Sequence, residues 1–171
     1  IRTSFIVNPR RGQVFVAKGV VIGLLGLAVT AITIPGMFLV SQPIFAFYDQ
    51  ETASVTDSAA IRFLLVGGLV QGVLYTLIPF SIAWILRGTA SAITTSIGFF
   101  FLPWMMAPLF PLWVKENVLR YLPDNAKDSM VGMVAKDAPT FVADGPALVL
   151  IGGWIIAGLL AAAYTLNRRD V

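Results

Sequence analysis

The chain has 171 residues, of which 57% are hydrophobic and only 12% are charged, and its formal net charge is +3. An average soluble domain carries about 25% charged residues, so this composition excludes an ordinary soluble fold and indicates a protein of the lipid bilayer. The chain contains no cysteine and no histidine. This argues against disulfides, thiol or imidazole catalysis and the usual zinc and haem ligand sets. We therefore expect no catalytic residue and no metal site.

Four long uncharged segments follow one another along the chain. They contain 30, 24, 27 and 23 residues, and about 20 apolar residues are enough for a transmembrane helix. We predict an all-α polytopic membrane protein whose four transmembrane helices lie at residues 19–41, 63–86, 89–113 and 147–166. Four buried apolar helices of a soluble protein are the alternative, but they would need a much larger protein around them.

Prolines and short turns predict the shape of these spans. The pair Pro35-Gly36 lies near the outer end of the first span, where we expect the helix to break. The turn at residues 87–89 is so short that the second and third spans must be antiparallel neighbours. Three prolines crowd the outer half of the third span, where a straight helix is not expected: Pro103, Pro108 and Pro111.

The outer loop of residues 114–146 contains one helical pattern. Apolar side chains recur at roughly helical spacing in the stretch WVKENVLRYL, and Pro123 follows it. We predict a short helix at the outer membrane surface that ends before Pro123.

Small residues spaced four apart are candidates for close helix packing in lipid. The same pattern also arises because small residues are simply common in membrane helices. The pairs are Gly19 and Gly23, Gly68 and Gly72, and Gly153 and Ala157.

The distribution of charge predicts the orientation. If both ends face the cytoplasm, the inner segments hold seven basic residues and one acid, and the outer segments hold five basic residues and eight acids. The inner side then carries +6 and the outer side −3, which agrees with the positive-inside rule. We predict a multi-pass protein of the cell membrane with both ends cytoplasmic. The lipid bilayer is the expected environment, and no nucleic acid is expected as a partner.

A basic segment, VNPRRGQVFVAKG, precedes the first span. Asn8 is a good helix cap and Pro9 suits the first helical position, so a helix is expected to start below the membrane. Orientation alone would explain the arginines, but it does not require the capped start or an apolar Phe5.

The segment IRTSFIVNPRRGQVFVAKG resembles the cytoplasmic loop before the third span of ABC-2 type permeases, the membrane subunits of many bacterial ABC exporters. The final TLNRRDV resembles the RRD tail of these permeases. The similarity covers essentially the whole chain as the last four of six spans, so two further spans are expected before Ile1.

This resemblance implies an ATP-driven exporter of hydrophobic or amphiphilic compounds. It implies a separate ABC ATPase, which would bind ATP and Mg²⁺, and a second copy of the permease. The chain has no phosphate-binding loop of its own. Residues 1–18 would form the coupling loop that contacts the ATPase, and the remaining residues, 19–171, would form the transmembrane domain. The expected coupling residues are Arg2, Phe5, Asn8, Pro9, Arg10, Arg11 and Lys18.

Polar and aromatic side chains within the second and third spans are candidates for a substrate pathway, because polar groups in lipid prefer protein or water. Hydrogen bonding between helices is the alternative explanation. The candidates are Gln71, Tyr75, Thr94, Thr95, Phe99 and Phe100.

Two other classes of function stay open at this stage. A membrane-embedded enzyme would need paired carboxylates or similar groups, and none is evident. A channel or ion-coupled carrier usually has a charged residue at membrane depth, and the four spans have none in their interiors.

Overall fold

The computed structural model describes residues 11–54 and 56–168, which form helices and connecting segments without a strand. Four helical stretches are long and apolar enough to cross a membrane. They are Gly12–Phe47, Ser58–Leu86, Thr89–Leu109 and Asp144–Leu166. The prediction of an all-helical protein with four candidate membrane-spanning helices is confirmed.

The elements follow one another in a simple order. They are α2 (Arg11–Phe47), α3 (Ser58–Arg62), the π-helical turn η1 (Phe63–Gly67), α4 (Gly68–Leu86), α5 (Thr89–Met106), the 3₁₀ turn η2 (Ala107–Leu109), α6 (Leu112–Asn117), the 3₁₀ turn η3 (Leu119–Tyr121), α7 (Pro123–Val131) and α8 (Asp144–Arg168).

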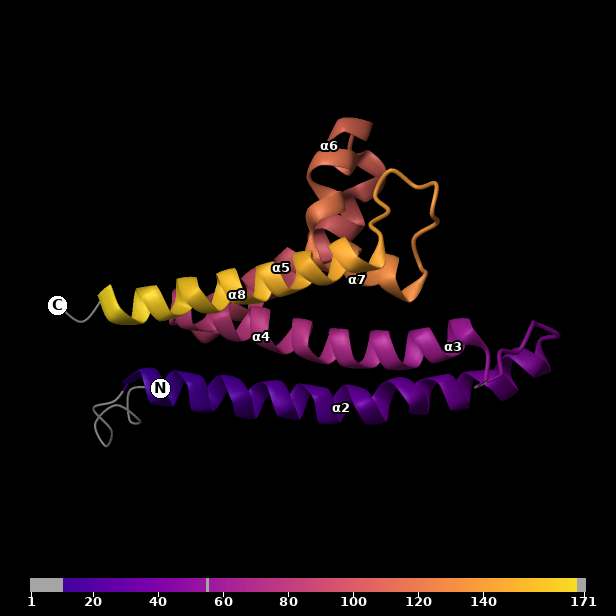
Figure 1. The fold of residues 1–171 in the computed structure, drawn as a ribbon, viewed down its shortest axis with the longest axis horizontal. Coiled ribbons are helices and arrows are strands. Elements are labelled where there is room, and N and C mark those ends of the chain that lie inside the picture. The colour runs from indigo at the N-terminus through magenta and orange to yellow at the C-terminus, as the bar shows by residue number, and fades with distance from the viewer. Residues whose placement is uncertain (1–10, 55, 169–171) are drawn as a thin grey trace.

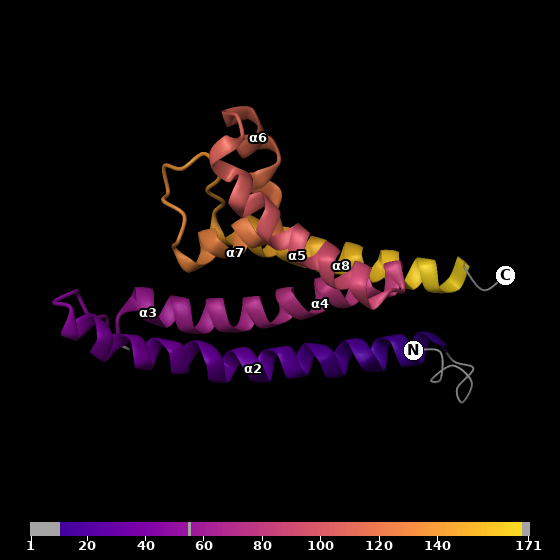
Figure 2. The same cartoon turned by 180° about the vertical axis from the view of Figure 1, so that it is seen from behind.

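Helix α4 is the centre of the bundle and packs against α2, α5 and α8. Figures 1 and 2 show α2 and α4 lying side by side along their lengths, with α8 on the other side of α4. The start of α2, the turn between α4 and α5 and the end of α8 lie at one end of the bundle (Figure 1). This end carries Lys18, Arg87 and Arg168, so we call it the inner end.

Helix α2 is unbroken, and the expected break at Pro35-Gly36 was wrong. Both Pro35 and Pro43 lie inside the helix. Each proline removes one backbone hydrogen bond, but leaving the helix at membrane depth would expose many more backbone groups to lipid. At about 1.5 Å per residue the helix is roughly 55 Å long, which exceeds the hydrocarbon core of about 30 Å.

The short turn between the second and third spans is present. Helix α4 ends at Leu86 and α5 begins at Thr89, and the two helices pack together. Arg87 has a left-handed backbone conformation with φ of 57°, and its N–H donates to the carbonyl of Ala83 at 3.0 Å. This residue closes α4 and reverses the chain.

The third span is shorter than predicted. Pro103 stays inside α5, but the helix ends at Met106 and the two later prolines mark its 3₁₀ extension and the start of α6. Pro123 also has two effects, because it ends the preceding turn and occupies the first position of α7. A proline is favoured there since its missing N–H would be unpaired anyway. Sequence reasoning therefore missed α7.

The closest contact between α2 and α4 is a glycine pair. A Cβ added to Gly26 would lie 2.7 Å from the Gly72 carbonyl oxygen, and one added to Gly72 would lie 3.1 Å from Cα of Leu27. Two threonines flank the contact, and the hydroxyl of each donates a hydrogen bond to a backbone carbonyl of its own helix. Thr30 donates to the Gly26 carbonyl at 2.9 Å, and Thr76 donates to the Gly72 carbonyl at 2.6 Å.

The predicted small-residue pairs have mixed outcomes. Gly72 is at the close contact, and Cβ atoms at Gly19 and Gly23 would meet side chains of α4 at 3.4 and 3.6 Å. Gly153 and Ala157 are exposed, and a Cβ at Gly153 would meet nothing within 4 Å. Within the described residues, this last pair is therefore a candidate that makes no close helix contact.

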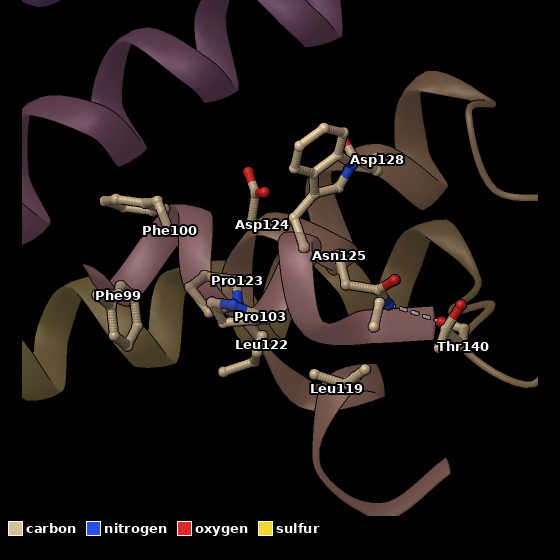
Figure 3. Close-up of a pocket in the computed structure, with 12 residues that line it drawn as sticks. Phe99, Phe100, Pro103, Leu119, Leu122, Pro123, Asp124, Asn125, Asp128 and Thr140 are labelled. Carbon is tan, nitrogen blue, oxygen red and sulfur yellow. Dashed lines mark hydrogen bonds between the residues drawn. The ribbon is translucent and has the colours of Figure 1, made fainter. Parts of the chain in front are cut away.

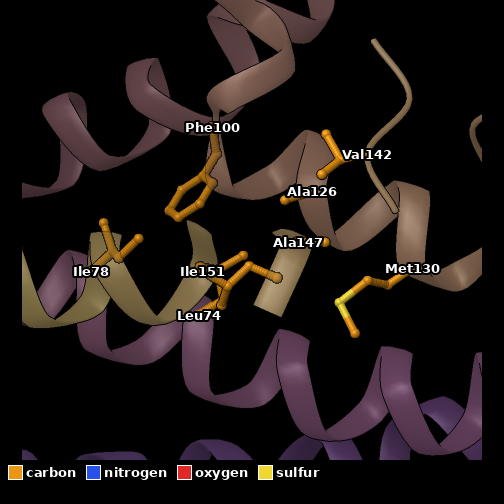
Figure 4. Packing of buried hydrophobic residues seen from close by; sticks show 8 residues of the cluster. All are labelled: Leu74, Ile78, Phe100, Ala126, Met130, Val142, Ala147 and Ile151. Atoms are coloured by element: carbon orange, nitrogen blue, oxygen red, sulfur yellow. The ribbon is translucent and has the colours of Figure 1, made fainter. Parts of the chain in front are cut away.

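Two groups of buried side chains hold the bundle together. The inner group joins α2, α4 and α8 and consists of Phe15, Phe80, Trp84, Ala162 and Leu166. The middle group joins α4, α5, α7 and α8 (Figure 4) and consists of Leu74, Ile78, Phe100, Ala126, Met130, Val142, Ala147 and Ile151.

We predict that Gly26→Ala destabilises the protein while Gly153→Ala does not. The added methyl group at Gly26 would meet backbone atoms of α4 and force the helices apart, at a cost of about 1–3 kcal/mol. Thermal unfolding in detergent micelles measures the difference. Equal melting temperatures of the two variants would show that α2 and α4 do not approach closely at Gly26.

Candidate functional site

The segment between α5 and α8 folds back into the bundle. We call residues 112–143 the return segment. The sequence predicted an outer loop with a short helix at the surface, but this segment contributes four hydrophobic side chains to the buried core: Leu119, Ala126, Met130 and Val142. Three of them belong to the middle group of buried side chains. The segment is therefore part of the packed protein, and its second helix, α7, lies against α8 and α4.

The contact of α7 with α4 is deep in the bundle. Tyr75 lies roughly 16 Å along α4 from its inner end, and Phe100 lies at a similar distance from the start of α5, at about 1.5 Å per residue. The two rings meet edge to face with their centroids 4.5 Å apart. Because the hydrocarbon core is about 30 Å thick, both rings lie near the middle of a membrane that starts at the Arg87 turn.

A cluster of charged and polar groups surrounds the Tyr75 hydroxyl. Lys127 Nζ lies 3.1 Å from Asp124 Oδ1 and 2.9 Å from Asp128 Oδ1. It also donates to the Tyr75 hydroxyl at 3.3 Å and lies 5.3 Å from the centre of that ring. The Tyr75 hydroxyl in turn donates to Asp124. We call these four residues the Lys127 cluster.

The environment of the cluster keeps Lys127 charged. Burial by itself lowers the pKa of the Lys127 ammonium, but the charge of Asp124 and the hydrogen bond and charge of Asp128 raise it, and the pKa lies above its ordinary value. Burial raises the pKa of the Asp128 carboxyl, which Lys127 only partly offsets. A buried charge is costly unless it is paired and hydrogen-bonded, and Lys127 has these partners.

Three polar contacts fix the shape of the return segment. The indole N–H of Trp154 in α8 donates to the Tyr121 carbonyl at 2.9 Å. The Asn125 amide donates to the Thr140 carbonyl at 2.6 Å. The Ser129 hydroxyl accepts a hydrogen bond from the Val142 N–H at 3.3 Å. The last of these bonds is buried, so it gives the Val142 N–H a partner that water could not supply.

A recess lies beside the cluster, between α5 and the return segment (Figure 3). Its volume is about 130 Å³. Three of its walls are aromatic side chains of α5, and its only charged lining groups are two carboxylates. We call it the aromatic recess, and its lining residues are Phe99, Phe100, Pro103, Trp104, Ala107, Leu119, Leu122, Pro123, Asp124, Asn125, Asp128 and Thr140.

The structure brings some of the predicted pathway residues together and separates others. Tyr75, Phe99 and Phe100 meet at the recess and the cluster, where Phe99 and Phe100 have centroids 5.2 Å apart. Gln71 lies on another side of α4 and lines a groove facing α2, which Tyr75 also borders. The remaining two, Thr94 and Thr95, are exposed on α5 and lie outside both sites.

Most of the predicted coupling residues lie outside the described residues. These are Arg2, Phe5, Asn8, Pro9 and Arg10. Arg11 is the first residue of α2. Lys18 lies two turns further along the same helix and is partly buried. Between them, Phe15 packs against Phe80 and Trp84 with centroid distances of 5.3 Å in both cases.

Sequence reasoning missed Asp124, Lys127 and Asp128. They had been assigned to an outer loop, and the spans themselves indeed lack charged residues in their interiors. One signal was available in the stretch PDNAKDSM. A proline at a first helical position and polar residues three and four apart predict a short helix with all three charges on one face. Nothing in the sequence, however, indicated that this helix returns to the middle of α4.

No family model, curated protein or solved structure matches the chain.

We predict that Lys127→Met destabilises the protein strongly, whereas Lys136→Met does not. Removing Lys127 leaves two partly buried carboxylates without a counter-charge, which costs up to about 3–5 kcal/mol. Lys136 is on the same segment but exposed, so its loss is expected to cost less than about 0.5 kcal/mol. Unfolding by a denaturing detergent measures both. Equal stability of the two variants would place Lys127 in water rather than in the bundle.

Proposed function

We propose that this chain is a permease subunit of an ATP-driven exporter, which moves a hydrophobic or amphiphilic compound out across the cell membrane. A separate ABC ATPase would supply the energy. The observation that carries this proposal is helix α2. Its described part starts within the basic segment, at Arg11, and continues without a break to Phe47. A rigid helix of this kind can carry a displacement of the basic segment into the membrane.

The inner end of α2 is attached to the rest of the bundle. Phe15 packs against Phe80 and Trp84 of α4, and these rings share their buried group with Ala162 and Leu166 of α8. A force on the first turn of α2 would therefore move three helices together rather than bend one. The close contact at Gly26 and Gly72 links α2 and α4 again further along.

The basic segment is suited to an acidic partner surface. Arg10 and Arg11 can form charge-assisted hydrogen bonds with carboxylates or with carbonyl groups at helix ends of the ATPase. Arg2, Phe5 and Lys18 would complete this contact. In this proposal ATP and Mg²⁺ bind the partner, and two permease copies enclose the pathway for the substrate. The aromatic recess beside α5 would be a contact for the cargo.

We predict that Arg10→Glu combined with Arg11→Glu abolishes ATPase attachment or uncouples ATP hydrolysis from transport. The reversal replaces attraction by repulsion at contacts worth about 1–3 kcal/mol each. Recovery of the ATPase with the purified variant, and substrate-stimulated hydrolysis in reconstituted vesicles, are the two measurements.

The control is Arg168→Glu combined with Arg169→Glu. This variant also replaces two arginines by glutamates on the side of the membrane predicted to be cytoplasmic, but at the other end of the chain. If the arginines of the basic segment only set the orientation, both variants will insert, bind the ATPase and transport equally well. That result would contradict the coupling function.

The Lys127 cluster favours a second candidate, an ion-coupled carrier. The four spans carry no charge in their interiors, but the return segment brings Asp124 and Lys127 against Tyr75 within the second span, and Asp128 pairs with Lys127. Charges at this depth commonly mark ion or proton pathways. Transport by vesicles that contain no ATP, driven by an imposed ion gradient, would favour this function over the exporter.

A further inference from the structure

We propose that the aromatic recess binds an organic monovalent cation, such as a quaternary ammonium group on an aromatic or alkyl body. That such a cation is the transported cargo rests on the proposed exporter function. Binding of the cation to the recess depends only on the charge and shape of the recess.

The charged groups that line the recess are acidic. Asp124 and Asp128 line it, and their side chains are 23% and 26% exposed. The Lys127 ammonium does not line the recess, although it contacts both carboxylates and the Tyr75 hydroxyl. When both carboxylates are ionised, the single ammonium leaves the group with a net charge of −1. Since an unbalanced charge at this depth is costly, a bound cation would be stabilised here more than at the protein surface.

The remaining walls of the recess also suit a cation. Phe99, Phe100 and Trp104 provide aromatic rings, whose faces attract cations within about 6 Å. The Trp104 side chain is 70% exposed, so its indole is accessible to a ligand. Pro103 and Leu122 add apolar surface for the body of the ligand. Carboxylates beside aromatic rings are a combination that recognises weakly hydrated organic cations.

Inorganic cations are a poorer fit. A metal ion needs several oxygen, nitrogen or sulfur ligands around it. Within residues 11–54 and 56–168, no group of acidic side chains is arranged to hold a metal. Anions are disfavoured by the two carboxylates, and a neutral compound would leave the net charge unbalanced.

The experiment measures binding of phenyltrimethylammonium to the purified protein in detergent by equilibrium dialysis. Its neutral isostere, tert-butylbenzene, is the competitor. We expect saturable binding of the cation and little competition from the isostere. Absence of saturable binding, or equal competition by tert-butylbenzene, would overturn the proposal. Loss of binding would leave the ATPase attachment test unaffected, so failure of this inference and failure of the exporter function are distinguishable.

Two variants locate the site. Asp128→Asn keeps the Lys127–Asp124 pair balanced, and we expect it to weaken cation binding about tenfold. Asp137→Asn is the matched control, because Asp137 is an exposed acid on the same segment, and it is expected to bind as the unchanged protein does. Trp104→Leu removes only an exposed ring and is expected to weaken binding about threefold to tenfold. If Asp128→Asn and Trp104→Leu both bind normally, the cation site is not in this recess.

Discussion

The pairing of Lys127 with two carboxylates is the interaction on which the rest of this structure depends. It allows a polar segment to enter the bundle. Burial of an ammonium without partners would cost far more free energy than the packing of apolar side chains contributes. The Lys127 ammonium contacts both Asp124 and Asp128, and its third partner is the hydroxyl of Tyr75 in the central helix. The return segment is therefore held to α4 by charge as well as by buried side chains.

The position of the return segment determines the shape of the outer half of the molecule. It lies beside α5, and it buries Ala126 and Met130 against Leu74 of α4. The same arrangement leaves the aromatic recess between α5 and α7, with its carboxylates facing the cavity. The inner half is built differently, because the aromatic group around Phe15 joins the helix ends to each other. In our proposals the outer half contacts the ligand and the inner half transmits movement.

Much of the fold could be predicted from the sequence, because long uncharged runs and the Arg87 turn leave few alternatives. The candidate site could be predicted only in part. Tyr75, Phe99 and Phe100 were expected to face protein, and they do meet. Their charged partners are separated from Tyr75 by about fifty residues in the chain, and the contact depends on the tertiary return of α7. Prolines were read wrongly in both directions: Pro35 does not break α2, and Pro123 starts a helix after ending a turn. In both cases, whether the proline ends or begins a helix depends on which backbone groups around it need hydrogen-bond partners.

The central structural claim is that α7 rests on the middle of α4, and a double-mutant cycle between Tyr75→Phe and Asp124→Asn tests it most directly. These two side chains share a hydrogen bond, so the losses in unfolding free energy should be non-additive, with a coupling of about 0.5–3 kcal/mol. If the return segment lay at the membrane surface, the two residues would not meet. The losses would then add to within about 0.5 kcal/mol, and that additivity would contradict the account.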